Sequence, residues 1–158
     1  MAKLAIRKAG DPVLKKTSAP VTKFDKKLRK LLDNMAETMY DANGVGLAAP
    51  QVGVNERVII IDVGEGLLEL INPEIIKAEG TQVCEQEGCL SVPDFYGTVE
   101  RALNVSVVAF DRYGKKFKLD ATDYLAQAIQ HEIDHLNGIL FIDKATSIAK
   151  IEPQGREG

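Results

Sequence analysis

The stretch TDYLAQAIQHEIDHLN, residues 122–137, decides the fold and carries the strongest chemical signal in the sequence. Within it, His131 and His135 stand four residues apart with Glu132 between them, which is the HExxH pattern. Residues four apart lie on the same face of an α-helix, so both imidazoles can reach one metal ion. These are the two histidines of the chain, and random placement would seldom set them around a glutamate in this way. The pattern predicts a metal-binding helix that ends at Gly138.

The neighbours of the histidines predict how this helix is oriented. A step of about 100° per residue places Tyr124 and Ala128 on the same arc as the two histidines. Glu132 lies next to that arc, where it borders an apolar stripe. The stripe is formed by Leu125, Ile129 and Leu136. Partial burial at this border would raise the pKa of the Glu132 carboxyl group, as a general base near neutral pH requires.

The rest of the chain predicts several strands and one further helix. An amphipathic helix is expected over residues 25–43, because leucines and methionines recur there at helical spacing and Asn43-Gly44 supplies a stop. A hairpin turn is expected at Asp111–Gly114. We therefore expect an α+β fold, with short antiparallel or mixed strands packed around the late metal-binding helix and an N-terminal amphipathic helix. The predicted strands are 57–63, 68–72, 73–78, 104–110 and 116–121.

Length and composition limit the class of protein. The 158 residues, 45% of them hydrophobic, suit one compact domain. We expect a single catalytic domain over residues 1–147 and a short polar C-terminal tail, 148–158, that frays. The net charge of -3 gives no electrostatic reason to expect a nucleic acid or a membrane surface as partner. No apolar run approaches the ~20 residues of a membrane helix, and the N-terminus lacks a secretory signal. The cytoplasm is therefore the expected location, with both cysteines as thiols.

Two histidines leave the metal site incomplete, because a catalytic divalent ion commonly takes three protein ligands and keeps one position for water. A downstream histidine of the HExxHxxGxxH type is absent, since that position holds Phe141. An upstream cysteine is the natural candidate, because thiolate and imidazole suit the same metals. Cys89 lies in a segment that predicts irregular structure, whereas Cys84 lies in one typical of a strand. On residue pattern alone, both cysteines remain candidates.

Three segments together resemble one protein family. They are GVGLAAPQ at 44–51, EGCLS at 87–91 and QHEIDH at 130–135. In this order and at these separations they resemble the peptide deformylases, and the resemblance extends from Gly10 to Phe141. It implies a metal-dependent hydrolase that removes the N-formyl group from the N-terminal methionine of newly synthesised proteins and releases formate.

The resemblance also implies roles for individual residues. Glu132 would transfer protons, while the side chain of Gln51 and the backbone N–H of Leu90 would stabilise negative charge on the formyl oxygen. One divalent metal ion per chain would be bound, with water in its fourth position. Its ligands would be Cys89, His131 and His135. The family favours Fe(II), and the same ligands also accept Zn(II), Ni(II) or Co(II).

Specificity for methionine requires an apolar slot beside the metal. Residues one and two turns before His131 face the same way, and the glycine-rich segment lies upstream, so both supply candidate walls. These walls are Tyr124, Gln127, Ala128 and Val45. Gly44 and Gly46 would leave room for the substrate backbone, lying there as an added strand. The expected partners are N-formylmethionyl nascent polypeptides, with transient association with the ribosome.

Two other classes of protein remain open on the residue pattern. A small zinc endopeptidase shares HExxH but needs a downstream ligand and a longer substrate cleft. A non-catalytic structural metal site needs a fourth protein ligand, for which Cys84 is the candidate. Glu87 and Arg101 either form an ion pair that braces the Cys89 segment or are unrelated surface charges.

Overall fold

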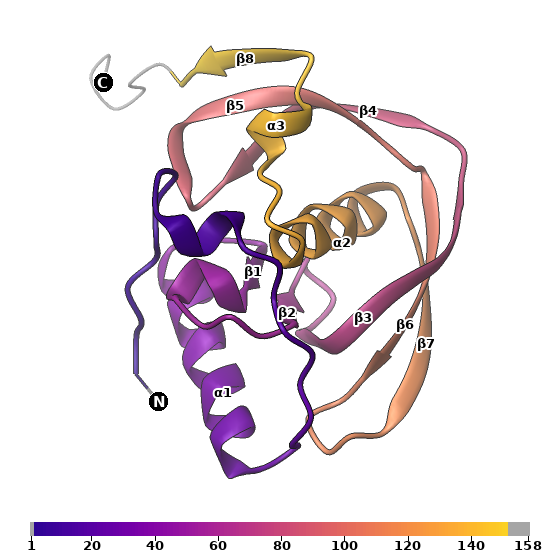
Figure 1. Cartoon of the computed structure of the whole chain (residues 1–158). Helices are drawn as coiled ribbons and strands as arrows, with labels where there is room; N and C mark the ends of the chain where they lie inside the picture. Colours follow the sequence, from indigo (N-terminus) through magenta and orange to yellow (C-terminus); the bar gives the residue numbers. More distant parts are fainter. Residues whose placement is uncertain (1, 152–158) are drawn as a thin grey trace.

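The computed structural model describes residues 2–151, in which two antiparallel sheets surround a central helix, α2 (Asp123–Leu136) (Figure 1). One sheet has the strand order β1-β2-β3-β6-β7, and the other has the order β4-β5-β8. The strands are β1 (Gly46–Ala48), β2 (Val58–Ile61), β3 (Leu68–Glu79), β4 (Gln82–Cys89), β5 (Val92–Arg101), β6 (Asn104–Phe110), β7 (Lys116–Thr122) and β8 (Ser147–Lys150). The other helices are α1 (Lys26–Asp41), α3 (Phe141–Lys144) and the 3₁₀ helices η1 (Pro12–Lys15) and η2 (Ala49–Val52). The expected α+β class, with an amphipathic first helix and a late central helix, is confirmed.

Strand β2 separates two hydrophobic cores, which explains why its sequence is apolar at every position. Ile59 and Ile61 face α2 and join a cluster that includes residues of β3 and β6. Val58 and Ile60 point to the opposite side and pack with the buried residues of α1. Because successive side chains of a strand alternate between faces, a strand covered on both faces has no polar positions. The two cores therefore fix α1 and α2 on opposite sides of the same sheet.

Strand β3 corrects one prediction from the sequence. Residues 68–72 and 73–78 were expected as two strands, but they form one strand with a register shift between Ile71 and Glu74. Asn72 has a positive φ of 52° at this shift, and Pro73 follows it. Proline lacks an N–H and is tolerated in a sheet at an irregularity of this kind. The bulge lets one strand pair with β2 at its start and with β6 at its end.

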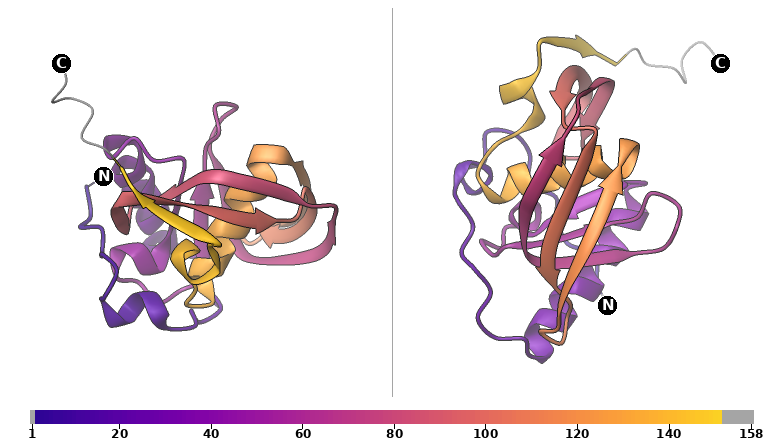
Figure 2. Two further views of the ribbon diagram at one scale, coloured as in Figure 1. Left: turned by 90° about the horizontal axis from the view of Figure 1, so that it is seen from above. Right: turned by 90° about the vertical axis from the view of Figure 1, so that its right-hand side faces the viewer.

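The C-terminal segment also differs from the expectation. Residues 148–150 belong to strand β8, which pairs antiparallel with β5 at the edge of the smaller sheet (Figure 2). The predicted polar tail therefore begins later than residue 148. The remainder of that predicted tail, residues 152–158, lies outside the described residues.

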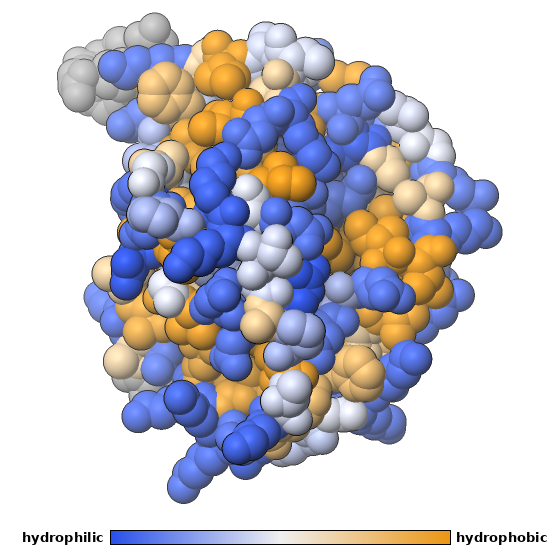
Figure 3. Space-filling model, viewed as in Figure 1, coloured by the Kyte–Doolittle hydropathy of each residue, from blue (hydrophilic) through white to orange (hydrophobic). Residues whose placement is uncertain are grey.

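Among the helices of residues 2–151, none combines the length and the apolar character needed to cross a membrane. The face shown in Figure 3 carries hydrophilic side chains over much of its area, with smaller hydrophobic areas between them.

The central position of α2 predicts that its apolar face contributes strongly to stability. Ile129 is fully buried in the α2 core, so Ile129→Ala should lower the free energy of unfolding by about 3 kcal/mol through lost packing and a residual cavity. The matched control is Ile76→Ala on β3, where the side chain is 51% exposed and the loss should be about 1 kcal/mol or less. Urea denaturation of the metal-loaded protein measures both. Equal losses would show that α2 does not pack as described.

Candidate active site

Three metal-binding side chains converge between α2 and the end of β4. Cys89 is the last residue of β4, while His131 and His135 lie one turn apart on α2. Their ligand atoms all lie within 4.8 Å of one another, and Cys89 Sγ is 3.3 Å from His135 Nε2. The spacing of the histidines on a helix was predicted correctly. Cys89 was expected in an irregular segment, but it lies at the end of a strand, where it pairs with Val92 after a register shift between Glu87 and Cys89.

The geometry of these three residues fits a divalent metal ion. Sulfur and nitrogen ligands of a tetrahedral ion lie about 3.5 Å apart, which agrees with the spacing of Cys89 and His135. His131 Nδ1 donates a hydrogen bond of 2.7 Å to Glu87, which leaves Nε2 as the free ligand atom. Burial lowers the pKa of His135 well below its usual value, so its ring is neutral, the form that binds a metal. Within residues 2–151, the group of converging ligands contains Cys89 and does not contain Cys84.

Glu132 lies beside this group with its carboxylate buried. Its Oε2 is 3.9 Å from His131 Nε2, and its Oε1 has no hydrogen-bond partner among the described residues. Burial raises the pKa of Glu132 to about 7. A carboxyl group with this pKa can both accept and release a proton near neutral pH.

The two glycines of the glycine-rich segment leave room for side chains of the site. The room for substrate backbone expected at Gly44 and Gly46 stays a prediction. A Cβ at Gly46 would lie 2.5 Å from Glu132 Oε2, and a Cβ at Gly44 would lie 2.7 Å from Leu90 Cδ1. Gly46 therefore permits the close approach of β1 to the carboxylate on α2.

Gln51 is held on both sides by backbone and side-chain hydrogen bonds. Its Oε1 accepts from the N–H of Ala48 at 2.9 Å, which turns its amide Nε2 toward the metal-binding group. Nε2 donates to Ser91 Oγ at 3.0 Å and lies 3.6 Å from Cys89 Sγ. Leu90, between Cys89 and Ser91, contributes to the lining of the same cavity. The predicted residues Gln51 and Leu90 thus lie next to the three ligand residues, and Ser91 is a contact that the sequence analysis missed.

The N-terminal segment forms backbone hydrogen bonds to both the Gln51 segment and the Ser91 segment. The sequence analysis did not connect this part of the chain to the site. The N–H of Arg7 donates to the carbonyl of Gln51 at 2.6 Å, and the N–H of Ala9 donates to the carbonyl of Ser91 at 2.8 Å. Both bonds join backbone groups, so no pattern of side chains in the sequence predicts them. They hold the Gln51 and Ser91 segments side by side.

A buried network of charges orients His131. Glu87 accepts hydrogen bonds from His131 and from two nitrogens of Arg101, and Arg101 Nη1 also donates to Asp134 at 3.0 Å. Burial alone would raise the pKa of Glu87, but the hydrogen bonds from Arg101 and His131 outweigh it and lower the pKa to about 2. The sequence left open whether Glu87 and Arg101 form an ion pair or are unrelated surface charges, and the structure contains the ion pair. Asp134 is 9% exposed and also pairs with Lys144.

These residues line a cavity of about 300 Å³. The wall residues expected from the sequence all contribute to it, together with Gln51, Cys89, Leu90, His131 and Glu132. Those expected wall residues are Val45, Tyr124, Gln127 and Ala128, and Gly44 and Gly46, expected to leave room for the substrate backbone, also line the cavity. His135 is 1% exposed and lies behind the surface of the cavity.

Comparison with known proteins identifies the family. The sequence pattern of the family described as polypeptide deformylase matches residues 3–150. The peptide deformylase of Halothermothrix orenii is 59% identical over 149 residues, covering 93% of this chain and 96% of that protein. The peptide deformylase of Pelotomaculum thermopropionicum is 54% identical, covering 98% of this chain and 99% of that protein. The crystal structure of the peptide deformylase from Thermotoga maritima is 44% identical and superimposes with a TM-score of 0.91, covering 93% of this chain and 100% of that chain.

The chain belongs to the polypeptide deformylase family. Its activity is the metal-dependent hydrolysis that removes the N-formyl group from newly synthesised proteins. The ligand atoms of the converging cysteine and histidines lie close enough together to hold the metal ion of a metal-dependent hydrolase. A small zinc endopeptidase and a purely structural metal module are thereby set aside.

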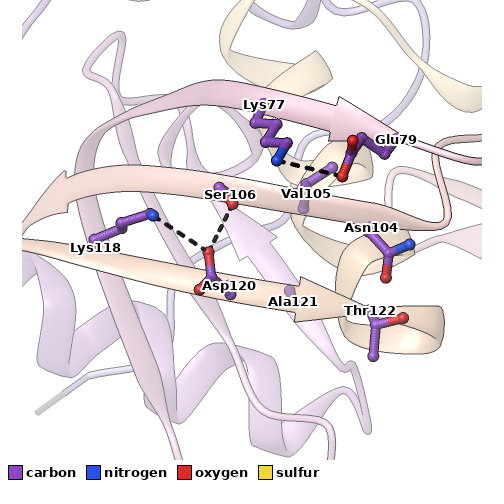
Figure 4. A pocket seen from close by; sticks show the side chains of 9 residues that line it. All are labelled: Lys77, Glu79, Asn104, Val105, Ser106, Lys118, Asp120, Ala121 and Thr122. Carbon is purple, nitrogen blue, oxygen red and sulfur yellow. Dashed lines mark hydrogen bonds and ion pairs between the residues drawn. The ribbon is translucent and has the colours of Figure 1, made fainter.

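A second hollow lies on the face formed by β3, β6 and β7, and it does not resemble a deformylase site (Figure 4). Its charged side chains already interact with one another, because Lys77 pairs with Glu79 and Lys118 pairs with Asp120. Asp120 also accepts a hydrogen bond from Ser106 at 2.6 Å. No cysteine or histidine lines it. The chemistry of the deformylase therefore belongs to the cavity beside α2.

Removing the cation at the centre of the deformylase's buried network should destabilise it more than removing a comparable surface cation. Arg101 and Arg112 each join two carboxylates, but their side chains are 2% and 24% exposed, respectively. Arg101→Met removes the guanidinium that Glu87 pairs with and leaves Asp134 with Lys144 alone, and it should cost about 3 to 5 kcal/mol of unfolding free energy. Arg112→Met should cost about 1 kcal/mol. Urea denaturation compares the two variants, and equal costs would contradict the role given to Arg101.

Proposed function

We propose that Cys89, His131 and His135 hold one divalent metal ion, and that Glu132 moves the proton during hydrolysis of the formyl group. The observation that carries this proposal is the convergence of the three ligand atoms within 4.8 Å, beside a buried carboxyl group whose pKa burial raises to about 7. The donor set leaves a fourth position for solvent, as a catalytic site needs. Fe(II) is the metal we propose, with Zn(II), Ni(II) and Co(II) as alternatives that cysteine and histidine also accept.

A divalent ion held by Cys89, His131 and His135 would supply a water of lowered pKa, about 7, and would polarise the formyl carbonyl. Glu132 accepts a proton from the attacking water on its carboxylate as the water oxygen bonds to the formyl carbon. It then delivers that proton to the nitrogen as the C–N bond breaks, so that the amine leaves as a free N-terminus and the formic acid formed ionises to formate. Burial raises the pKa of Glu132, and a carboxyl group is suited to accept and then release a proton when its pKa lies near the working pH.

Two hydrogen-bond donors of the chain are proposed to stabilise the negative charge that develops on the formyl oxygen. One is Gln51 Nε2, which the bond from Ala48 N–H to Gln51 Oε1 turns toward Cys89. The other is the backbone N–H of Leu90, next to Cys89 in the chain. A donor of this kind typically contributes about 3 kcal/mol to transition-state stabilisation. Backbone hydrogen bonds from the N-terminal segment hold the Gln51 segment and the segment around Leu90 in place. Both donors are therefore positioned before substrate binds.

The methionine side chain is proposed to enter the cavity between the glycine-rich segment and α2. Val45, Tyr124, Gln127 and Ala128 form the proposed walls, and all four line the cavity. Strands β1 and β4 are the terminal strands of their sheets, so each has unpaired backbone groups at its edge. A peptide in extended conformation can therefore add to one of these edges while methionine occupies the slot.

The proposed setting is the cytoplasm, where the substrates are N-formylmethionyl nascent polypeptides and contact with the ribosome is transient. We propose one catalytic domain over residues 1–147, to which residues 148–150 attach through the pairing of β8 with β5. No nucleic-acid or membrane partner is proposed, because the net charge of -3 favours neither.

A change of Glu132 to glutamine separates proton transfer from metal binding. Glu132→Gln keeps the shape of the side chain but removes its basicity, so the variant should retain the metal and lose about a thousandfold in kcat on formyl-Met-Ala-Ser. The matched control is Glu85→Gln on the exposed side of β4, which should keep full activity. Unformylated Met-Ala-Ser should not be cleaved by either protein. Metal analysis and kinetics test the proposal, and substantial turnover by metal-loaded Glu132→Gln would remove Glu132 from its role.

A further inference from the structure

Ser91 is a fully buried polar residue to which the proposed function gives no role. It is 0% exposed and, unlike Gln51 and Cys89, it does not line the cavity. Its hydroxyl oxygen accepts a hydrogen bond from Gln51 Nε2 at 3.0 Å, and its backbone N–H donates to Cys89 Sγ at 3.4 Å. Its carbonyl accepts from the N–H of Ala9 at 2.8 Å. Ser91 therefore lies behind Gln51, held in place but out of reach of a substrate in the cavity.

The orientation of the Gln51 amide follows from its neighbour Ala48. The backbone N–H of Ala48 can only donate, so the amide atom 2.9 Å from it is the acceptor Oε1. This assignment turns Nε2 toward Ser91, whose hydroxyl oxygen can accept. Gln51 is 1% exposed, so water does not compete for these bonds. The contact at Oε1 and the contact at Nε2 together fix the plane of the amide.

The amide nitrogen of Gln51 carries two hydrogens, and the bond to Ser91 uses one of them. The planar amide directs the other hydrogen away from Ser91, toward the side of Cys89, whose Sγ lies 3.6 Å from Nε2. The three proposed ligand atoms converge on that side. A substrate oxygen bound there meets a donor whose direction is already set. Such a donor stabilises developing charge without first having to reorient.

We propose that the hydroxyl group of Ser91 is a positioning group for the reaction, which holds one hydrogen of the Gln51 amide so that the other points at the formyl oxygen. This inference rests on the proposed role of Gln51 and adds the residue that gives this donor its direction. Without the hydroxyl, a buried amide hydrogen loses its partner, and the amide can turn to find another. The formyl oxygen then meets a donor that is no longer aligned in the transition state.

The test compares Ser91→Ala with Ser18→Ala on formyl-Met-Ala-Ser. Ser18 is the matched control, because it is 3% exposed and its hydroxyl has no hydrogen-bond partner among residues 2–151. Ser91→Ala keeps the backbone N–H that donates to Cys89 Sγ, so its metal content should equal that of the unmodified protein. Its kcat should fall about tenfold, as for the loss of one neutral hydrogen bond in the transition state, with KM unchanged. Ser18→Ala should keep both constants.

A double-mutant cycle shows whether Ser91 acts through Gln51. Gln51→Ala should lower kcat about a hundredfold. Adding Ser91→Ala to it should lower kcat by less than about twofold more, because the hydroxyl then has no amide to orient. The side-chain amide resonances of Gln51 supply a readout apart from turnover. In isotope-labelled, zinc-loaded protein they are assigned by their loss in Gln51→Ala, and they should shift in Ser91→Ala but not in Ser18→Ala.

Three results would each overturn the inference. They are an unchanged kcat in Ser91→Ala, a loss of kcat that is as large with Gln51→Ala as without it, and Gln51 amide resonances that stay in place in Ser91→Ala. In each case, the fall in kcat of Gln51→Ala would leave the proposed function intact. Full kcat in Gln51→Ala would instead count against the proposed role of Gln51 and would remove the inference with it.

Discussion

The carboxylate of Glu87 connects the parts of the chain that form the site. It lies on β4, accepts hydrogen bonds from Arg101 on β5, and accepts a third from His131 on α2. A buried charge without partners costs several kcal/mol, so β4, β5 and α2 are stable together only when this contact is made. The same contact fixes the ring of His131, so that one nitrogen faces Glu87 and the other faces Cys89. A single interaction thus sets both the packing and the orientation of a metal ligand.

Two buried glutamates near His131 differ in charge because their surroundings differ. Glu87 has the guanidinium of Arg101 beside it, and its pKa is lowered to about 2. Among residues 2–151 no guanidinium pairs with Glu132, and burial raises its pKa to about 7. One carboxylate can therefore remain a fixed anion that orients a ligand, while the other exchanges protons. The absence of a side chain at Gly46 is part of this arrangement, because it gives the Glu132 carboxylate its space.

Much of this arrangement could be predicted from residue patterns, and the rest depends on long-range contacts. The spacing of His131 and His135 predicts a shared helical face, since helix geometry is local. The irregularity at Pro73 was not recognised as a bulge within one strand. A proline is compatible both with a break between two strands and with a bulge in one strand, so the local sequence does not distinguish them. The bonds from Arg7 and Ala9 to the site loops join backbone groups far apart in the chain, and no residue type is needed for them. The pairing of β8 was missed for the same reason.

The central claim is that one thiolate and two imidazoles bind a single ion whose remaining position is open to solvent. X-ray absorption spectroscopy of protein purified without oxygen tests it most directly, because it identifies the ligand atoms and their distances from the metal. The account predicts one sulfur at about 2.3 Å and two imidazole nitrogens at about 2.1 Å, together with a light solvent atom. The sulfur signal should persist in Cys84→Ser and vanish in Cys89→Ser. A spectrum with two sulfur ligands, or with no sulfur in the unmodified protein, would contradict the account.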